Sequence, residues 1–191
     1  CTECKILSPD KDGIGEIAVR GKNVFSGYYK DEEATALSFK DGWFLTGDYG
    51  KKDKDGNLYI NGRKKNLIIL DNGKNIYTEV LEAYFTENCP FIKEAVVLEH
   101  TRTVNGETAK LLALAVSVNK GFFENVSDEK MIEDISEQVY RLNEALPAYK
   151  RIADVMAVRK EFEKTSTMKI IRRKVEEEYK NYTDLRDKNY A

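Results

Sequence analysis

The sequence predicts an α+β protein in which a β-rich segment is followed by a small α+β domain. Up to residue 62, short runs alternate polar and apolar side chains between glycine turns, a pattern typical of strands. Beyond residue 62, apolar side chains recur at helical spacings of three and four, with strand-like runs between them. A domain of about three strands packed with helices would bury both kinds of apolar surface.

Three apolar runs in the first part predict strands, at residues 16–20, 43–46 and 58–60. The first run follows a turn with two glycines at residues 12–15. Residues 53–57, between the second and third runs, contain Asp-Gly, which favours a hairpin turn. We therefore expect this part to be all β.

The second part is expected to begin with a strand at residues 66–70, which ends in an Asp-Asn-Gly turn. A helix should follow with Asn75 as its N-cap, because apolar residues fall at i, i+3, i+4, i+7 and i+8: Tyr77, Val80, Leu81, Tyr84 and Phe85. Two further apolar runs, 92–98 and 111–118, predict strands.

The C-terminal third predicts a helix, a strand and a last helix. Apolar residues keep helical spacing through 128–146, and Pro147 would end that helix. Residues 152–158 predict a strand. The polar residues 181–191 are expected to fray. They follow a helix that we infer from three residues on one face: Ile171, Val175 and Tyr179.

The composition is that of an ordinary globular protein. Of the 191 residues, 41% are hydrophobic and 34% are charged, and the net charge of −2 gives no indication of a nucleic-acid partner. The longest apolar stretch, 111–118, is too short to cross a bilayer, so no transmembrane segment is expected. The first residue is Cys1 rather than Met, so we expect the chain to begin inside a longer protein.

The cysteines and the single histidine do not predict a metal site. Cys1 and Cys4 have the spacing of a metal knuckle, but no second pair follows, and structural zinc needs four ligands. Together with Cys89 they form the odd, sparse set that is typical of reduced thiols in the cytosol. His100 follows a strand-like run and is expected to be a surface residue at a strand end.

Two segments near the domain junction carry residue types that suit a nucleotide. Asp48 ends the run Asp-Gly-Trp-Phe-Leu-Thr-Gly-Asp, where its carboxylate could bind a ribose diol or merely occupy a tight turn. Three consecutive cations follow Gly62, and they either contact an anion or form a solvated linker: Arg63, Lys64 and Lys65.

Two later segments also combine glycine or hydroxyl residues with lysine. Gly73, followed by Lys74, could let a ligand approach the backbone, or could serve a strand-to-helix turn. The hydroxyl residues 165–167 could cap a helix that starts near Lys169. A lysine there could offset negative charge on a phosphate or carboxylate, or could be part of a basic first turn.

In this order and spacing, the segments resemble the adenylate-forming superfamily of acyl-CoA synthetases, peptide-synthetase adenylation domains and beetle luciferases. The similar motifs span nearly the whole chain: Gly-Glu-Ile-x-Val-Arg-Gly, Gly-Tyr-Tyr, Gly-Trp-Phe-x-Thr-Gly-Asp, Gly-Arg-Lys-Lys-Asn and the terminal lysine motif. Residues 72–77 and the Thr-x-Thr-x-Lys-Ile ending resemble long-chain fatty acid–CoA ligases most.

The resemblance implies a role for each candidate residue. Asp48 would bind the ribose hydroxyls of ATP, and Arg63 would also contact the nucleotide. Lys169 would be catalytic, because it would contact the carboxylate and the α-phosphate during adenylation. Gly73 and Lys74 would lie in the segment that binds CoA.

The resemblance also implies a division of the chain. Residues 1–62 would end the large adenylation domain, residues 63–65 would form a hinge at Lys65, and residues 66–191 would form a mobile C-terminal domain. The remaining N-terminal adenylation domain would be the missing partner. The substrates and cofactors would be a fatty acid, ATP, Mg²⁺ and CoA, with none held tightly by this chain alone.

The implied reaction joins a carboxylic acid to CoA through an acyl-adenylate, in the cytoplasm or at a membrane surface. Without the phosphate loop, adenine pocket and acyl tunnel of the large domain, the chain should be inactive alone. One departure is Met168, where many members have glycine; two others are Thr78 and Val80, which replace a proline and a glutamate. The alternatives are an enzyme that loads a carrier protein or uses an aryl acid, and a degenerate, non-catalytic interaction domain.

Overall fold

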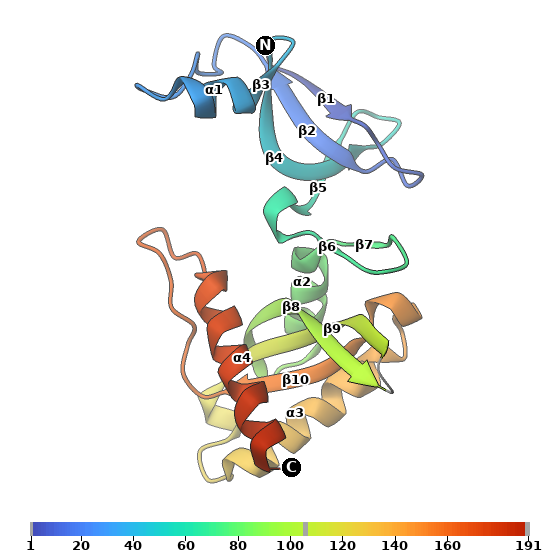
Figure 1. The fold of residues 1–191 in the computed structure, drawn as a ribbon, viewed down its shortest axis with the longest axis vertical. Coiled ribbons are helices and arrows are strands. Elements are labelled where there is room, and N and C mark those ends of the chain that lie inside the picture. Colours follow the sequence, from blue (N-terminus) through green and yellow to red (C-terminus); the bar gives the residue numbers. More distant parts are fainter. Residues whose placement is uncertain (1, 105–106, 190–191) are drawn as a thin grey trace. The chain divides into compact units, whose positions relative to one another are not determined.

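The computed structural model describes residues 2–104 and 107–189, which form two compact units (Figure 1). The first unit is Cys1–Leu67 and the second is Ile68–Ala191. Each unit has its own sheet and its own buried residues, so each is described by itself.

The first unit is built on a five-stranded antiparallel sheet, in which β1, β2, β4 and β3 are neighbours in that order and β5 pairs with β4. Its strands are β1 (Glu3–Leu7), β2 (Gly15–Arg20), β3 (Phe39–Lys40), β4 (Trp43–Lys52) and β5 (Leu58–Arg63). One short helix, α1 (Glu32–Ser38), starts where the Asp31 carboxylate accepts a hydrogen bond from the Ala34 amide. The sequence did not predict α1, because none of its residues is buried.

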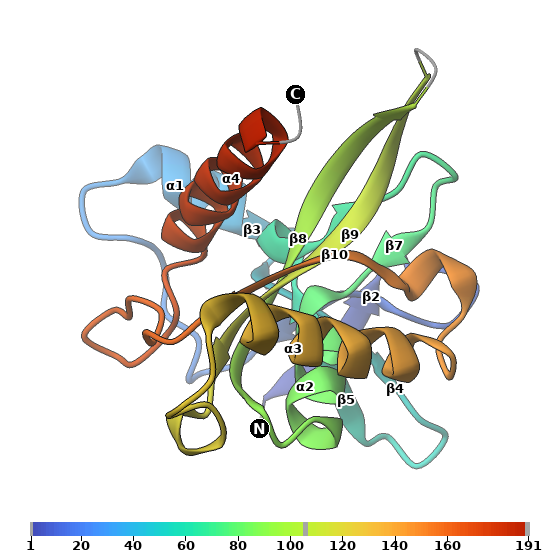
Figure 2. The ribbon, with the colours of Figure 1, turned by 90° about the horizontal axis from the view of Figure 1, so that it is seen from below.

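The second unit contains a three-stranded sheet with helices on both faces (Figures 1 and 2). The middle strand β9 (Glu107–Val118) is antiparallel to β8 (Ile92–Val104) and parallel to β10 (Ile152–Val158). Helices α2 (Thr78–Asn88) and α3 (Asp128–Asn143) cover one face, and α4 (Arg172–Asn189) covers the other. A small hairpin of β6 (Ile68–Ile69) and β7 (Asn75–Ile76) precedes α2.

Alternating strand side chains divide the second unit into two hydrophobic clusters. Val97 faces the cluster that includes Phe85 of α2 and Ile135 of α3, whereas its neighbour Val96 faces the cluster that includes Val175 of α4. All of these side chains are buried. Three strands packed between helices confirm the α+β class predicted for this part of the chain.

Several predicted boundaries were wrong at the start of the second unit. Only residues 68–69 of the expected strand 66–70 pair as a strand, because residues 64–66 form a 3₁₀ turn, η1 (Lys64–Asn66). Asn75 is not a helix cap, since it belongs to β7, and α2 begins after Tyr77 without a side-chain cap. Local capping chemistry therefore does not fix the start of α2.

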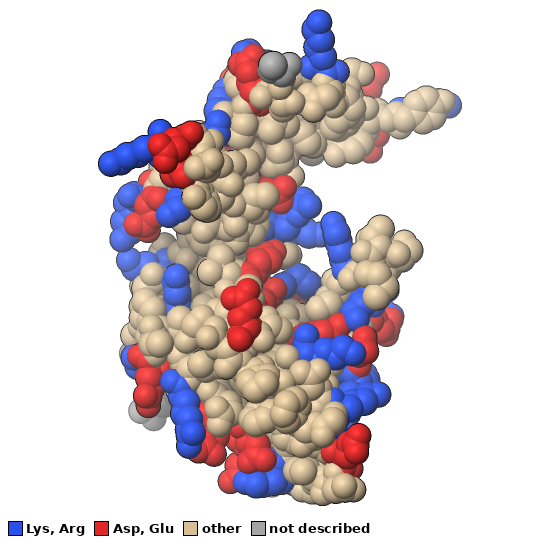
Figure 3. Space-filling view, turned by 180° about the vertical axis from the view of Figure 1, so that it is seen from behind, with Lys and Arg blue, Asp and Glu red and all other residues tan. Residues whose placement is uncertain are grey.

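Other corrections concern the ends of later elements. The segment expected to fray after residue 181 continues as helix α4 to Asn189. His100 lies within β8 rather than at its end, because that strand runs on to Val104. Between the predicted strands 92–98 and 111–118, Gly106 marks an expected turn, which lies outside the described residues. On the side shown in Figure 3, basic and acidic side chains intermingle over each unit.

None of the helices in the described part of the chain has the length and hydropathy needed to cross a bilayer.

Candidate functional site

A bulge in β4 positions Asp48 in the first unit. Three residues of β4, from Thr46 to Asp48, stand opposite one residue of β2, Ile17. The Thr46 hydroxyl fixes the bulge, because it donates to the Ile17 carbonyl at 2.9 Å and accepts from the Asp48 amide at 3.1 Å. Gly47 has φ +70°, a conformation that favours glycine. The carboxylate thus projects from a backbone kink held by hydrogen bonds.

Asp48 and Arg63 form an ion pair across the sheet. The two residues are register partners of β4 and β5, and Arg63 Nε lies 2.9 Å from Asp48 Oδ1. The Asp48 side chain is 25% exposed and that of Arg63 is 47% exposed, so both can meet a ligand from solvent. The structure therefore brings together the two residues that the sequence assigned to a nucleotide.

A second ion pair holds the next cation of the hinge segment. Lys64 Nζ lies 2.7 Å from the Glu16 carboxylate, and this hydrogen bond raises the pKa of Lys64. Lys65 follows in η1 and is exposed. Among the described residues, none forms an ion pair with Lys65. Arg63 and Lys64 are thus bound to the sheet of the first unit, whereas the amine of Lys65 faces solvent.

In the second unit, Gly73 and Lys74 lie in the turn between β6 and β7. The Gly73 amide donates to the Leu70 carbonyl at 2.8 Å, and Gly73 has φ +72°. A Cβ atom there would have no neighbour within 4 Å, so backbone conformation rather than space explains the glycine. Lys74 Nζ lies 5.5 Å from the centre of the Tyr149 ring, a cation–π distance.

A shallow cavity of about 230 Å³ lies beside this turn. The Asp71 carboxylate accepts a hydrogen bond from the Lys110 amide at 2.9 Å and so ties the turn to β9. The cavity is lined by residues of the turn, of β9 and of the segment before β10: Leu70, Asp71, Asn72, Lys110, Leu111, Leu112, Ala148, Tyr149 and Arg151. Basic, aromatic and apolar groups therefore adjoin Gly73 and Lys74.

Lys169 lies in a closed turn and not at a helix start, so the predicted hydroxyl cap is wrong. The Thr165 amide donates to the Lys169 carbonyl at 2.8 Å, and the Thr165 hydroxyl accepts from the Lys169 amide at 3.2 Å. Lys164 and Ile170 pair as an isolated antiparallel bridge that closes the turn. Because Thr165 uses its hydroxyl inside the turn, helix α4 starts only at Arg172.

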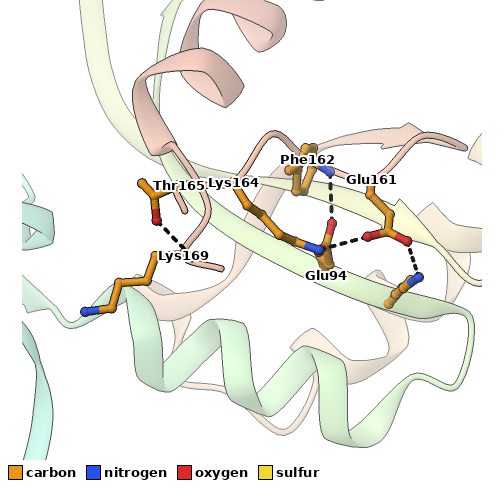
Figure 4. Close-up of polar contacts among 7 residues, drawn as sticks. Glu94, Glu161, Phe162, Lys164, Thr165 and Lys169 are labelled. Atoms are coloured by element: carbon orange, nitrogen blue, oxygen red, sulfur yellow. Dashed lines mark hydrogen bonds and ion pairs between the residues drawn. The ribbon is translucent and has the colours of Figure 1, made fainter. Parts of the chain in front are cut away.

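The amine of Lys169 points away from the polar groups around the turn, as Figure 4 shows. Lys169 is exposed, and among the described residues none makes a hydrogen bond or ion pair with its Nζ. Met168, immediately before it, has φ +61°. The turn thus presents a free amine on a backbone that is fixed by internal hydrogen bonds.

Arg172 anchors the chain just after this turn. Its guanidinium contacts the Glu82 carboxylate of α2 at 2.6 Å and the Val97 carbonyl of β8 at 2.7 Å. Glu82 also accepts from the Val97 amide at 2.8 Å. Burial raises the pKa of Glu82 even though Arg172 acts in the opposite direction. Sequence reasoning missed this anchor, because no local pattern links residues so far apart.

The histidine belongs to a separate polar cluster under α4. The Tyr179 hydroxyl donates to Asp154 at 2.6 Å and lies 2.8 Å from His100 Nδ1, so the ring N–H is the donor to the tyrosine oxygen. These residues line a cavity of about 1110 Å³ along β8, β10 and α4. His100 is thus half-buried and hydrogen-bonded to another side chain, unlike the surface residue expected.

The described residues offer no cluster that would suit a metal ion. Within 2–104 and 107–189, no three His, Cys, Asp or Glu side chains lie in positions to share one. Of the two cysteines with metal-knuckle spacing, Cys1 lies outside the described residues and Cys4 is half-buried. Cys89 is buried. Burial raises the pKa of the Cys89 thiol.

Comparison with known sequences links the chain to enzymes that activate acids. A family model described as AMP-binding enzyme C-terminal domain matches residues 65–185. A long-chain-fatty-acid–CoA ligase of Gallus gallus is 42% identical over 118 residues, which cover 60% of this chain and 14% of that protein. The ligase FadD15 of Mycobacterium tuberculosis is 33% identical over 186 residues, covering 86% of this chain and 30% of that protein.

Another relative carries a different substrate in its name. The indoleacetate–CoA ligase of Aromatoleum aromaticum is 47% identical over 83 residues, covering 44% of this chain and 16% of that protein. The chain therefore spans less than a third of the length of these curated relatives.

Solved structures show the same fold. The o-succinylbenzoate CoA synthetase of Bacillus subtilis, in complex with an acyl-adenylate intermediate, has a TM-score of 0.69 at 28% identity. The alignment covers 91% of this chain and 33% of that one. An ATP-bound RpMatB–BxBclM chimera has a TM-score of 0.75 at 26% identity, covering 94% of this chain and 34% of the chimera.

Proposed function

We propose, from the premise that this chain belongs to the AMP-binding enzyme C-terminal domain family, that it is the C-terminal part of an ATP-dependent acyl-CoA ligase. The full enzyme would activate a carboxylic acid as an acyl-adenylate, release pyrophosphate and transfer the acyl group to CoA with loss of AMP. A long-chain fatty acid is the proposed substrate, because two of the most similar relatives are named as long-chain ligases. The proposed location is the cytoplasm, in keeping with the sparse cysteines.

The observation that carries this proposal is the free amine of Lys169 on its closed turn. The attacking carboxylate and the α-phosphate both bear negative charge, which repels the two reactants and grows on the phosphate oxygens in the transition state. A lysine held by the Thr165 hydrogen bonds would stabilise that charge without having to reorganise first. Lys169 is therefore the proposed catalytic residue of adenylation.

Asp48 and Arg63 are the proposed nucleotide-binding residues. Arg63 Nε occupies one side of the Asp48 carboxylate, at Oδ1, and a carboxylate has further acceptor sites for ribose hydroxyls. The paired arginine keeps Asp48 oriented and supplies donors of its own to an oxygen of the nucleotide. The bulge at Gly47 sets the direction of the pair.

Lys65 is the proposed hinge between residues 1–62 and 66–191. Arg63 and Lys64 are held to the first unit by ion pairs, so backbone rotation is least restrained from Lys65 onwards. A hinge of this kind lets one catalytic centre serve two reactions, since Lys169 is needed for adenylation and a thiol must replace it afterwards.

Gly73 and Lys74 are the proposed CoA-binding residues. Phosphates of CoA would meet the Lys74 amine, and the adjacent cavity offers Arg151 and the Tyr149 ring for further contacts. Mg²⁺ is a proposed cofactor of the full enzyme, where phosphate oxygens and water would supply most of its ligands.

Three alternatives can be tested by experiment. An aryl or indole acid would replace the fatty acid if this protein resembled its indoleacetate relative in substrate. A carrier protein would replace CoA as the acceptor of the acyl group. A non-catalytic descendant would retain the fold without activity.

The test uses the full-length enzyme with ATP, Mg²⁺, CoA and acids from acetate to palmitate, with benzoate and indoleacetate included. Thioester formation that peaks on long chains is the expected result. Thioester formation that peaks on aryl acids would show that the substrate is an aryl acid and not a fatty acid. Acid-dependent pyrophosphate release without thioester would show that the acyl group goes to an acceptor other than CoA. If the full-length enzyme forms no thioester and releases no pyrophosphate with any acid, the ligase assignment is overturned.

Lys169→Ala tests the catalytic residue directly. We expect the substitution to lower acid-dependent pyrophosphate release by about 100-fold or more, as loss of one charge-stabilising group does. Thioester formation from a supplied acyl-adenylate should fall far less. Lys120→Ala, at an exposed lysine of the 3₁₀ turn η2 (Lys120–Phe122), is the matched control. Equal losses in both half-reactions would contradict a role confined to adenylation.

A further inference from the structure

The segment between β10 and α4 carries Lys169, and it has no regular secondary structure of its own apart from the closed turn. The position of the Lys169 amine therefore depends on the contacts that hold this segment against the sheet. Two such contacts start from one carboxylate, that of Glu94 on β8 (Figure 4).

The Glu94 carboxylate contacts the segment between β10 and α4 at two points. One carboxylate oxygen, Oε2, accepts a hydrogen bond from the Phe162 amide at 2.9 Å. The other, Oε1, lies 2.5 Å from Lys164 Nζ. The Lys164 side chain is only 19% exposed and that of Glu94 only 11%, so water screens this pair far less than a surface ion pair. The two contacts fix both the position and the direction of the chain at residues 162–164.

The closed turn transmits this restraint to Lys169. Lys164 pairs directly with Ile170 as an antiparallel bridge, and Thr165 is joined to Lys169 by hydrogen bonds in both directions. Both ends of the turn are thus linked by backbone contacts, so a displacement of Lys164 would also displace Lys169.

A bulge in β8 explains why Glu94 points at the segment. The register with β9 shifts between Ile92 and Glu94, so Lys93 is the extra residue. Lys93 contacts Glu161, and Glu161 in turn lies 2.8 Å from Lys164. These two cations hold the pKa of Glu161 at about 2. This outer part of the cluster is half exposed, so it contributes less to position than the Glu94 pair.

The C-terminal end of the segment has anchoring contacts of its own. Arg172 is fixed by Glu82 and by the Val97 carbonyl. The Glu94 contacts are therefore the ones that set the first half of the segment, and the Arg172 contacts set the second half.

We propose that Glu94 is a positioning residue for adenylation, which acts through Lys164 and Phe162 to hold the turn that presents Lys169. This inference rests on the proposed function of Lys169. It assigns a role to a carboxylate that contacts the Phe162 amide and Lys164 and that sequence reasoning did not single out.

The test compares Glu94→Gln, Lys164→Gln and the double variant in the full-length enzyme. Each single change should lower kcat for acid-dependent pyrophosphate release by about 10- to 100-fold, because small displacements of a catalytic group have effects of this size. The thioester step from a supplied acyl-adenylate should change by less than about threefold. The double variant should be no slower than the slower single variant, since both act through one contact.

The control is Glu137→Gln, which removes an exposed i,i+4 pair with Arg141 on α3 and should leave both half-reactions unchanged. Circular dichroism and the midpoint of thermal unfolding show whether each variant folds. If Glu94→Gln does not fold, Lys164→Gln carries the test, because the Lys164 side chain is more exposed than that of Glu94.

The outcomes separate the inference from the function on which it rests. If Lys169→Ala abolishes adenylation while folded Glu94→Gln and Lys164→Gln retain it, the positioning role is overturned and the ligase assignment stands. If both half-reactions fall equally in Glu94→Gln, its role is general stability and the proposal is again overturned. If Lys169→Ala has no effect on adenylation, the proposed catalytic role of Lys169 is wrong, and the positioning role of Glu94 that rests on it is overturned with it.

Discussion

At the scale of single residues, the turn that presents Lys169 depends on an unusual backbone conformation. Met168 has φ +61°, a region in which residues with a Cβ atom are strained by about 1 kcal/mol. Its side chain is 72% exposed and so gains little from packing. The family resemblance implied a glycine at this position, and a positive φ is a conformation that glycine adopts without strain.

Substitutions at Met168 should rank by how well they tolerate positive φ. We expect Met168→Gly to change the free energy of unfolding by less than about 0.5 kcal/mol, because relief of strain offsets the greater freedom of glycine in the unfolded chain. Met168→Val should lower it by about 1 kcal/mol or more, since a branched Cβ is least tolerated there. Urea denaturation followed by circular dichroism measures both. A valine variant as stable as the glycine variant would contradict the strain argument.

The candidate residues differ in how far sequence alone could place them. Asp48 and Arg63 were assigned separately to a nucleotide, and the register of β4 and β5 makes them partners. Glu94 and Phe162 are 68 residues apart in sequence, so no local pattern could connect them. Motifs therefore predicted which residues to consider, whereas the contacts that orient them depend on the tertiary fold.

At the scale of elements, periodicity predicted the large strands and helices well. The three strands of the second sheet and helices α2 and α3 all lie where apolar spacing placed them. Short elements without a buried face were missed, among them β1, β3 and α1. The start of α4 was misplaced by the hydroxyls of residues 165–167, because a Thr hydroxyl can close a turn as readily as it can cap a helix.

The start of α4 also depends on a half-buried ion pair. We expect Glu82→Ala to lower the free energy of unfolding by about 1–3 kcal/mol, because the Arg172 guanidinium and the Val97 amide would lose their shared acceptor in a site with little water. Glu87→Ala, at an exposed position on the same helix, should change it by less than about 0.5 kcal/mol. Thermal and urea unfolding of both variants provide the comparison. Similar stabilities for the two would argue against an anchoring role for Glu82.

The pH dependence of this difference follows from the raised pKa of Glu82. Its ordinary value is 4.5, and the folded protein binds the proton more tightly than the unfolded chain does. The stability that the group contributes is therefore fully present below pH 4.5 and decreases as pH rises through the folded pKa. The difference in free energy of unfolding between wild type and Glu82→Ala should accordingly be larger at pH 4 than at pH 7.

At the scale of the whole molecule, the proposed site is divided between two units. Asp48 and Arg63 belong to the first, whereas Gly73, Lys74 and Lys169 belong to the second. The match to adenylate-forming enzymes covers nearly all of this chain but about a third of the solved structures. The resemblance inferred from sequence motifs is thereby confirmed, while most of the contacts to ATP and acid would come from elsewhere.

The isolated chain should therefore be inactive. We expect purified residues 1–191 to release no AMP or pyrophosphate in response to added fatty acid, because the acyl pocket and most contacts to ATP would be missing. The full-length enzyme under the same conditions is the positive control. Acid-dependent AMP release by the isolated chain would show that it holds a complete catalytic centre.

The pairing of β10 with β9 imposes an order on how a newly made chain matures. The strands β8 and β9 are neighbours in sequence and can pair early. The strand β10 can pair with β9 only after residues 119–151 have been synthesised and have folded back. Lys164 can reach Glu94 only after that. The lysine that would touch phosphate is consequently set in place only after the β8–β9 hairpin has formed.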